Sequence, residues 1–424
     1  MGKNYIILNR ENMIIYKRQI RQRYLLLLVL LLILSFTSVN FFSSFPILNS
    51  QIERIIQLLV LIIICIIIRQ KNVSFKSYHK VILVYILWAI IGVIRGIFKA
   101  DCYWEYNQLT IGMMSLSLPL FIFIFNSPQI VSELYKKWLK LCIPAFFIFF
   151  YWVSGATQFY LSPIFLLSCF IPIIPKKWML IICLLLIMMG SDFANRSQVI
   201  KVIICIFFSI IYALHKNIPV FFLKILNISF YTIPICFLYL GISGKYNIFA
   251  DGLSSNSHQY ITQSSNGEMT NLNADTRTFI YKEVIQSAIK HKYIIAGRTP
   301  ALGNDSEYFN DITTNTQYQK PIRYMNELCH LNIFTWLGVI GVVLFSSIFL
   351  MSSWLAINHS NNFALKIIGC YIAFNWFYGW IENMNRFDIS NIFLWLVIAM
   401  GYSKEFRSYT DIEFSIWIKS LFKF

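Results

Sequence analysis

The chain has 424 residues, of which 57% are hydrophobic and only 13% are charged, whereas charged residues make up about 25% of an ordinary globular domain. This composition excludes a soluble enzyme, a secreted disulfide scaffold and a coiled coil, and it predicts an integral membrane protein. The net charge of +17 would suggest nucleic acid as a partner of a soluble protein. In a membrane protein we expect the charge to reflect topology and predict no nucleic-acid partner.

Long apolar segments follow one another along the chain. A helix needs about 20 mostly apolar residues to cross a bilayer core of about 30 Å, and by this measure the sequence contains about twelve spans. They cover approximately residues 24–42, 52–68, 81–94, 109–125, 139–153, 159–174, 178–189, 199–214, 218–242, 331–355, 363–380 and 389–402. The sixth and seventh are short and almost adjacent, so a tight hairpin of tilted or partly re-entrant helices is an alternative there.

The distribution of Lys and Arg predicts the orientation of these spans. With the N-terminus inside, the inner segments hold the whole charge excess and the outer face is neutral, as the positive-inside rule requires. We therefore expect a cytoplasmic basic N-terminus at residues 1–23, spans at 24–242 and 331–402, and a cytoplasmic tail at 403–424. The first apolar segment follows a basic region but is too long for a signal peptide, so it is predicted to be an uncleaved span.

One outer segment, residues 243–330, is much longer than the other loops, and long loops often carry function. Its stretch 276–293 is predicted to form an amphipathic helix that rests on the membrane surface, with Asp275 as N-cap. The apolar face of that helix consists of Phe279, Ile280, Val284, Ala288 and Ile289.

Several outer arginines are candidates for binding a pyrophosphate, because a guanidinium binds phosphate oxygens bidentately and stays charged. The long loop holds Arg277, Arg298 and Arg323, and the short loop 190–198 ends in Arg196 and Ser197 at the start of a helix, where backbone N–H groups also favour anions. The alternative for any single arginine, and above all for Arg323, is that it solvates the loop or pairs with its acids.

Two further polar groups lie at the outer ends of spans. Glu327 and His330 stand just before the tenth span and are candidate general bases, His330 because its pKa lies near neutrality and Glu327 if burial raises its pKa. The alternative for His330 is an interfacial residue that only caps the helix. Between the last two spans, the group at 382–388, which includes Arg386, either pairs with the long loop or contacts sugar hydroxyls.

This layout resembles the O-antigen polymerases and ligases of bacterial cell envelopes, which are polytopic membrane glycosyltransferases. The resemblance covers nearly the whole chain and rests on short motifs in the outer loops. They are Asn195-Arg196-Ser197, Arg277 at the start of the helical part of the long loop, the turn Gly297-Arg298, and His330-Leu331-Asn332 followed by a span with Gly338 and Gly341.

The resemblance implies a GT-C-like fold in the bacterial inner membrane, with an active site that faces the periplasm and both termini in the cytoplasm. The donor would be a glycan on undecaprenyl pyrophosphate, held by Arg196, Arg277 and Arg298. His330 or Glu327 would activate the acceptor hydroxyl. No cofactor or metal is implied, and the partners would be the lipid-linked donor and acceptor, the bilayer and a chain-length regulator.

Polymerase and ligase differ in the acceptor, which is another lipid-linked repeat unit or the lipid A core. Ligases more often end the long loop in a His-x-His-Asn-like element, and Cys329-His330-Leu331-Asn332 departs from it, so the polymerase is preferred and the ligase is the alternative. A transporter or flippase is the second alternative. It is disfavoured because the two halves show no similarity and the charged residues cluster at span ends.

Overall fold

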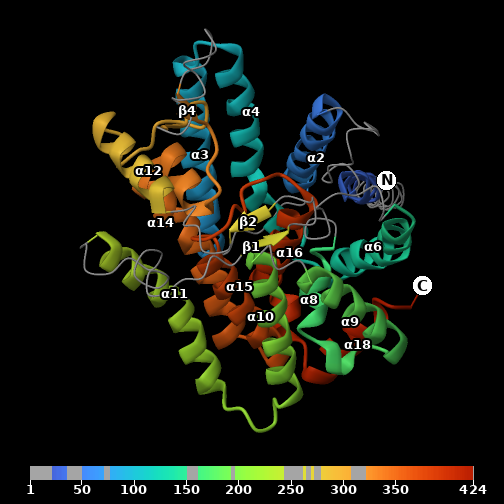
Figure 1. Cartoon of the computed structure of the whole chain (residues 1–424). Coiled ribbons are helices and arrows are strands. Elements are labelled where there is room, and N and C mark those ends of the chain that lie inside the picture. The colour runs from blue at the N-terminus through green and yellow to red at the C-terminus, as the bar shows by residue number, and fades with distance from the viewer. Residues whose placement is uncertain are drawn as a thin grey trace, which may run out of the picture.

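The computed structural model describes residues 22–35, 50–70, 77–149, 161–191, 196–242, 261–263, 269–271, 278–306 and 321–423. These residues are mostly helical (Figure 1). Five of the helical segments are long and apolar enough to cross a membrane, namely Ser77–Lys99, Tyr103–Ile124, Arg196–Ala213, Val220–Tyr239 and Cys329–Asn358. The predicted all-α membrane class is thereby confirmed, and the total of about twelve spans stays a prediction.

The elements of the described residues are given in chain order. The helices are Gln22–Ser35, α2 (Ser50–Gln70), α3 (Lys80–Lys99), α4 (Tyr103–Ser117), α5 (Phe121–Ile124), α6 (Pro128–Phe149), α8 (Ile164–Ser168), α9 (Lys176–Gly190), α10 (Arg196–Ala213), α11 (Val220–Ile242), α12 (Thr278–Lys290), α14 (Cys329–Asn358), α15 (Phe363–Tyr378), α16 (Ile389–Tyr402), α17 (Lys404–Ser408) and α18 (Asp411–Ser420). Short 3-10 turns cover Ser77–His79, Leu118–Leu120 and Ile171–Ile173. Strand β1 (Ile261–Gln263) pairs antiparallel with β2 (Met269–Asn271), and β3 (Asn304–Asp305) pairs antiparallel with β4 (Ile322–Arg323).

The region of the predicted sixth span is not one continuous helix. From residue 161 onward it consists of the five-residue helix α8, a turn and a 3-10 turn that contains Pro172. Proline has no backbone N–H to donate and clashes with the preceding helical turn, so Pro163 and Pro172 keep the helix short. The segment is nevertheless deeply buried from Leu161 to Phe170, and it therefore belongs to the interior of the bundle.

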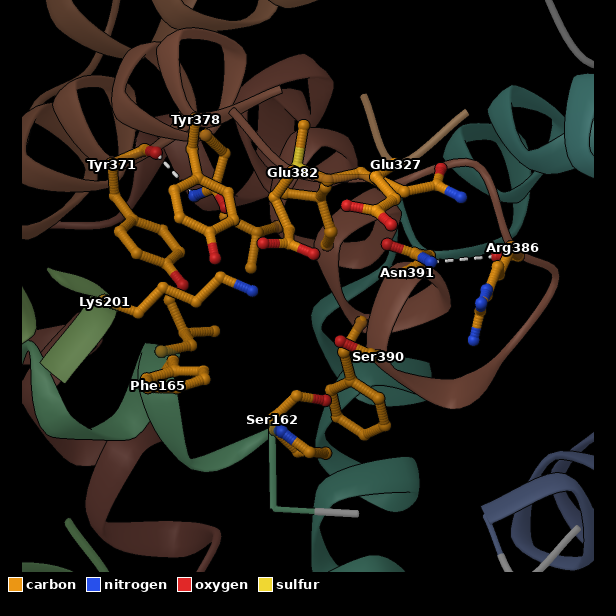
Figure 2. A pocket seen from close by; sticks show the side chains of 18 of the residues that line it. Ser162, Phe165, Lys201, Glu327, Tyr371, Tyr378, Glu382, Arg386, Ser390 and Asn391 are labelled. Atoms are coloured by element: carbon orange, nitrogen blue, oxygen red, sulfur yellow. Dashed lines mark hydrogen bonds between the residues drawn. The ribbon is translucent and has the colours of Figure 1, made fainter. Parts of the chain in front are cut away.

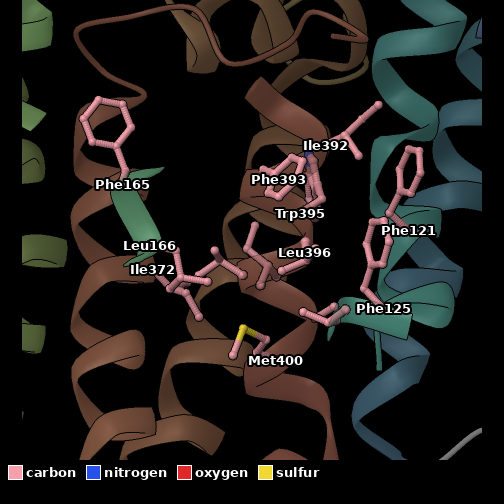
Figure 3. Close-up of a cluster of buried hydrophobic side chains, with 14 of the residues drawn as sticks. Phe121, Phe125, Phe165, Leu166, Ile372, Ile392, Phe393, Trp395, Leu396 and Met400 are labelled. Atoms are coloured by element: carbon pink, nitrogen blue, oxygen red, sulfur yellow. The ribbon is translucent and has the colours of Figure 1, made fainter. Parts of the chain in front are cut away.

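The centre of the bundle is formed by α14, α15 and α16, which pack against one another and against α3, α10 and α11. Figure 3 shows α16 presenting Trp395, Leu396 and Met400 between α5 on one side and α8 on the other. By contrast, α2, α3, α10 and α11 expose rows of leucine, isoleucine and phenylalanine. Exposed apolar rows on long helices are what lipid-facing surfaces require.

Two of the segments predicted to lie outside are found at the same end of the bundle (Figure 1). The turn between α3 and α4 and helix α12 lie at that end, whereas the turn between α10 and α11 lies at the opposite end (Figure 1). Residues 403–423, the predicted tail, fold against the bundle, because Phe414 and Ile418 of α18 are fully buried. Helix α18 starts with a capping box between Thr410 and Glu413, which satisfies two of its free N–H groups.

Helix α12 forms where the amphipathic pattern predicts a helix, and part of its apolar row packs against the bundle. Ile280 and Val284 pack against Leu328 and Leu331 at the start of α14. The side chain of Ile289 is exposed, while Asp275 and the side chain of Phe279 lie outside the described residues. Most of the apolar face of α12 is therefore used to attach the long loop to the bundle.

Helix α14 is interrupted at Gly338, whose φ of 70° and ψ of −169° are not helical. The chain at 294–298 lies beside the interruption, and Gly297, also with a positive φ of 72°, contacts the backbone of Trp336 and Leu337. Two motifs that are far apart in the sequence, Gly297-Arg298 and Gly338, thus meet in the fold.

Candidate functional site

A cavity of about 250 Å³ lies where α10, α15 and α16 meet the loop before α14 and the loop before α16 (Figure 2). Its charged lining residues are Lys201 from α10, Glu327 from the loop before α14, and Glu382 and Arg386 from the loop between α15 and α16. The other lining residues are aromatic, amide, hydroxyl or apolar, namely Tyr135, Ser162, Pro163, Phe165, Leu166, Met325, Asn326, Tyr371, Asn375, Tyr378, Asn383, Met384, Ser390, Asn391, Phe393, Leu394 and Val397. Two cations, two carboxylates and several aromatic rings therefore share one small space.

Lys201 extends from α10 along aromatic surfaces into the cavity. Its Nζ lies 4.5 Å from the ring centroid of Tyr378 and 5.9 Å from that of Phe165, distances at which a ring face attracts a cation. In Figure 2 the ammonium points toward the carboxylate of Glu382. The aromatic walls thus hold a positive charge inside the cavity, beside a negative one.

The loop between α15 and α16 is fixed by its own polar side chains. Asp388 caps α16 by accepting from the backbone N–H of Asn391 at 2.9 Å, and the Asn391 amide donates to the carbonyl of Arg386 at 3.0 Å. The amide of Asn385 donates to the carbonyl of Cys329 at 2.7 Å. These bonds hold the backbone of Arg386, so that its exposed guanidinium lies at the edge of the cavity.

Asp388 lies buried behind this edge. Burial raises its pKa to about 6, although the hydrogen bond from Asn391 and the charges of Arg386 and Lys201 act in the opposite direction. The carboxyl group of Asp388 therefore changes charge in the mildly acidic range and alters the field that both cations experience.

Glu327 is placed by an asparagine pair next to it. The backbone N–H of Asn326 donates to Oδ1 of Asn332 at 2.6 Å, and Nδ2 of Asn332 donates back to the carbonyl of Asn326 at 2.9 Å. Asn332 also donates to Asn383 at 3.3 Å, which links the two loops that line the cavity. The structure thus gives Asn332, the last residue of the His330-Leu331-Asn332 motif, a positioning role.

His330 lies outside the cavity lining. It is 1% exposed, its Nε2 lies 2.9 Å from the carbonyl oxygen of Trp376, and its ring centroid is 4.3 Å from that of Trp380. Because a carbonyl only accepts, Nε2 must carry the proton. His330 is therefore packed as a hydrogen-bonded core residue behind the cavity, whereas Glu327, the other candidate base, lines it.

Two of the loop arginines bind carboxylates of the same loop. Arg323 pairs with Glu283 at 3.6 Å, and both side chains are about nine-tenths buried, with 10% and 8% exposed. Arg298 donates to the carbonyl of Gly303 at 2.7 Å and to Asp305 at 3.1 Å. Neither arginine lines the cavity.

The ion cluster around Asp305 has a clear electrostatic signature. Burial alone would raise the pKa of its carboxyl group. Hydrogen bonds from Lys290 and His291, both at 2.8 Å, together with the charge of Arg298, instead lower the pKa to about 2. The carboxyl group of Asp305 is therefore ionised at neutral pH, and its ion pairs connect the end of α12 to the hairpin of β3 and β4.

The remaining predicted residues are at the first turn of α10 or outside the described chain. Arg196 is the first residue of α10 and is exposed, Ser197 is buried, and neither lines the cavity. Arg277 lies outside the described residues. The structure thus brings together Glu327 and Arg386 from among the predicted residues.

Lys201 was not among the site residues predicted from the sequence. The signal was present, because a lysine within an apolar helix is costly and marks a functional position by default. Glu382 was noted only as part of a polar group. Among the described residues, no three histidine, cysteine or acidic side chains come together as metal ligands.

Comparisons of the chain with protein-family models, with curated proteins and with solved structures gave no significant match.

Proposed function

We propose that this protein is a membrane glycosyltransferase of the O-antigen polymerase type, located in the bacterial inner membrane with its site facing the periplasm. It would transfer a glycan chain from undecaprenyl pyrophosphate to a sugar hydroxyl of another lipid-linked repeat unit. The observation that carries the proposal is the cavity in which Lys201 and Arg386 face the carboxylates of Glu327 and Glu382. The predicted layout of spans and outer loops is consistent with it.

The lining suits a phosphorylated sugar better than an apolar ligand. The cavity volume of about 250 Å³ is below the range of about 300–1,000 Å³ for pockets that bind drug-sized ligands. The cavity would therefore hold about one sugar ring and its phosphate rather than a whole glycan. Lys201 and Arg386 would bind the phosphate oxygens. Amide groups and tyrosine rings would bind the sugar hydroxyls and ring faces.

The proposed reaction is a displacement at the anomeric carbon of the donor. The acceptor oxygen forms a bond to that carbon, the bond from carbon to pyrophosphate oxygen breaks, and undecaprenyl pyrophosphate leaves with the electron pair. The hydroxyl proton passes to a carboxylate, for which Glu327 and Glu382 are the two candidates in the cavity. Lys201 and Arg386 would stabilise the negative charge that develops on the leaving group.

The test is an assay of the purified protein with lipid-linked repeat units and no nucleotide, with products separated on a gel. We expect a ladder of lengthened glycans. Lys201→Met and Arg386→Ala should each lower the rate by about 10²-fold or more, since a fixed cation at a developing charge contributes on that scale. Glu327→Gln and Glu382→Gln identify the base, whose loss should cost about 10²–10⁴-fold.

Lys419→Ala is the matched control, because Lys419 is an exposed lysine of α18 that does not line the cavity. It should leave the rate unchanged. If the glycan were transferred only to lipid A core, the protein would be a ligase and not a polymerase. Transbilayer movement of the lipid-linked glycan without any transfer would replace both by a flippase, and full activity in the Lys201→Met and Arg386→Ala variants would refute the site.

A further inference from the structure

The break in α14 is stabilised by the segment 294–298. The backbone N–H of Val339 donates to the carbonyl of Ile294 at 2.9 Å, and that of Ile340 donates to the carbonyl of Ile295 at 3.4 Å. In return, the N–H of Arg298 donates to the carbonyl of Thr335 at 2.7 Å. The segment thus supplies hydrogen bonds that the interrupted helix cannot make within itself.

The segment lies well below the end of the bundle. At about 1.5 Å per residue, Gly338 is about 14 Å along α14 from its start at Cys329. The neighbouring helix α3 gives a second measure, because Pro300 lies beside Gly92, which is about 10 Å before the helix end at Lys99. With a hydrocarbon core of about 30 Å, both helices place the segment within one leaflet.

Gly112 of α4 allows the segment's continuation to pack closely, and two glycines of α3 lie at ordinary contact distance from it. A Cβ atom added to Gly112 of α4 would lie 2.7 Å from Pro300, and one added to Gly96 of α3 would lie 3.5 Å from Ala301 and 3.6 Å from Thr299. A Cβ atom on Gly92 of α3 would lie 3.9 Å from Pro300. Residues 299–301 are therefore seated against α3 and α4, where small residues leave room.

The carbonyl groups of the segment are hydrogen-bonded, as a nonpolar surrounding requires. The carbonyls of Ile294 and Ile295 accept from α14, and the guanidinium of Arg95 donates to the carbonyls of Ala296 and Gly297 at 2.7 Å and 2.9 Å. Four successive carbonyls thus have partners within the protein. Non-helical backbone is tolerated at membrane depth only when its polar groups are satisfied by protein or water.

The side chains of the segment continue a lipid-facing surface. Ile294 and Ile295 are 43% and 68% exposed, and beside them Val339, Ile340 and Val343 of α14 are 45%, 37% and 58% exposed. Helix α3, which packs against α14, also exposes rows of leucine and isoleucine. Exposure of these apolar side chains to water would be unfavourable, whereas contact with lipid acyl chains would not.

We infer that residues 294–301 of the long outer loop form a re-entrant segment, with Ile294 and Ile295 in contact with lipid acyl chains. The long loop then has a membrane-inserted part besides its aqueous part. Inserted between α3, α4 and the break in α14, the segment fixes the short first half of α14, Cys329 to Leu337, next to the cavity. This inference does not depend on the reaction that the protein catalyses.

The first test uses the unaltered protein in vesicles of phosphatidylethanolamine and phosphatidylglycerol, with an apolar photolabel dissolved in the acyl chains. Labelled residues are located by peptide mapping. We expect the peptide with Ile294 and Ile295 to be labelled to the same extent as the peptide with Val343. Labelling at the background level of the loop peptide 321–327 would overturn the inference.

The second test places a charge at the same position. Ile295→Asp should lower the amount of folded protein in the membrane by about tenfold or more, since a carboxylate in the bilayer interior disfavours insertion at least on that scale. Ile285→Asp, on an exposed face of α12, is the matched control and should be tolerated. Equal yields of the two variants would also overturn the inference, whatever the activity of the protein.

Discussion

The Gly338→Ala substitution tests the account of the broken helix most directly. The backbone of Gly338 has φ 70° and ψ −169°, a combination that is open essentially to glycine alone. An added Cβ atom would lie 2.1 Å from the carbonyl oxygen of Ile295 and 2.5 Å from the nitrogen of Gly297. These neighbours are backbone atoms that cannot rotate away, so the segment 294–298 has to move.

The magnitude follows from two contributions. The backbone conformation costs about 1–3 kcal/mol for any residue other than glycine. Displacing the segment also weakens the hydrogen bonds from Val339 and Ile340 to Ile294 and Ile295, each worth about 1 kcal/mol. We expect the free energy of unfolding to fall by about 3–5 kcal/mol in total.

The assay is an unfolding titration with SDS in mixed micelles, read by circular dichroism. Gly190→Ala is the control, because a Cβ atom added to Gly190 at the end of α9 would meet only Val202 at 3.7 Å, an ordinary contact. It should change stability by less than about 1 kcal/mol. If Gly338→Ala proved as stable as Gly190→Ala, the non-helical conformation at Gly338 and the contact with Ile295 would both be refuted.

Three further substitutions test the surroundings of the cavity. His330→Phe keeps the ring packing but removes one of the two hydrogen bonds to the carbonyl of Trp376, the other coming from the backbone N–H of Gly379. We therefore expect about 0.5–1.5 kcal/mol less stability and a glycan-transfer rate within a few-fold of the wild type; a folded variant without activity would contradict the core role of His330. Burial raises the pKa of Asp388 to about 6, so the folded protein binds the extra proton and the free energy of unfolding should fall by up to about 3 kcal/mol as the pH rises from 4 to 6. Asp388→Asn should abolish this slope in pH-dependent melting curves, and an unchanged slope would show that another group titrates. Arg323→Met should cost about 3–5 kcal/mol because it leaves Glu283 as an uncompensated buried charge, while the double variant Arg323→Met/Glu283→Leu should regain much of that loss; a double variant less stable than the single one would argue against this pairing.

The helical membrane class and the position of α12 could be predicted from the sequence. Both predictions depend on local properties. The composition of a segment shows whether lipid or water surrounds it, and the spacing of its apolar residues shows which of them share one side of a helix. The amphipathic stretch 276–293 corresponds to Thr278–Lys290. The partner of its apolar face could not be predicted, since packing against Leu328 and contact with lipid require the same residue types.

The break in α14 was not readable from the sequence. Gly338 resembles Gly341 and Gly369, which also stand in apolar helices, and only the approach of Ile295 distinguishes it. In the same way, a histidine at the start of a span has the same sequence pattern whether it lines a cavity or packs inside. His330 packs inside because its ring contacts Trp380 and lies within hydrogen-bond distance of the carbonyl of Trp376.

The sequence by itself determined that this chain is a helical membrane protein with its net positive charge in the predicted inner segments, because those properties follow from composition and from the order of apolar and basic segments. Only the tertiary structure decided which polar residues share a space. Lys201, Glu327 and Arg386 come from three separate segments and line the same cavity. Arg323 does not line it and pairs with Glu283 instead. Proximity between such segments depends on how the helices pack, which is a property of the whole chain rather than of any local pattern.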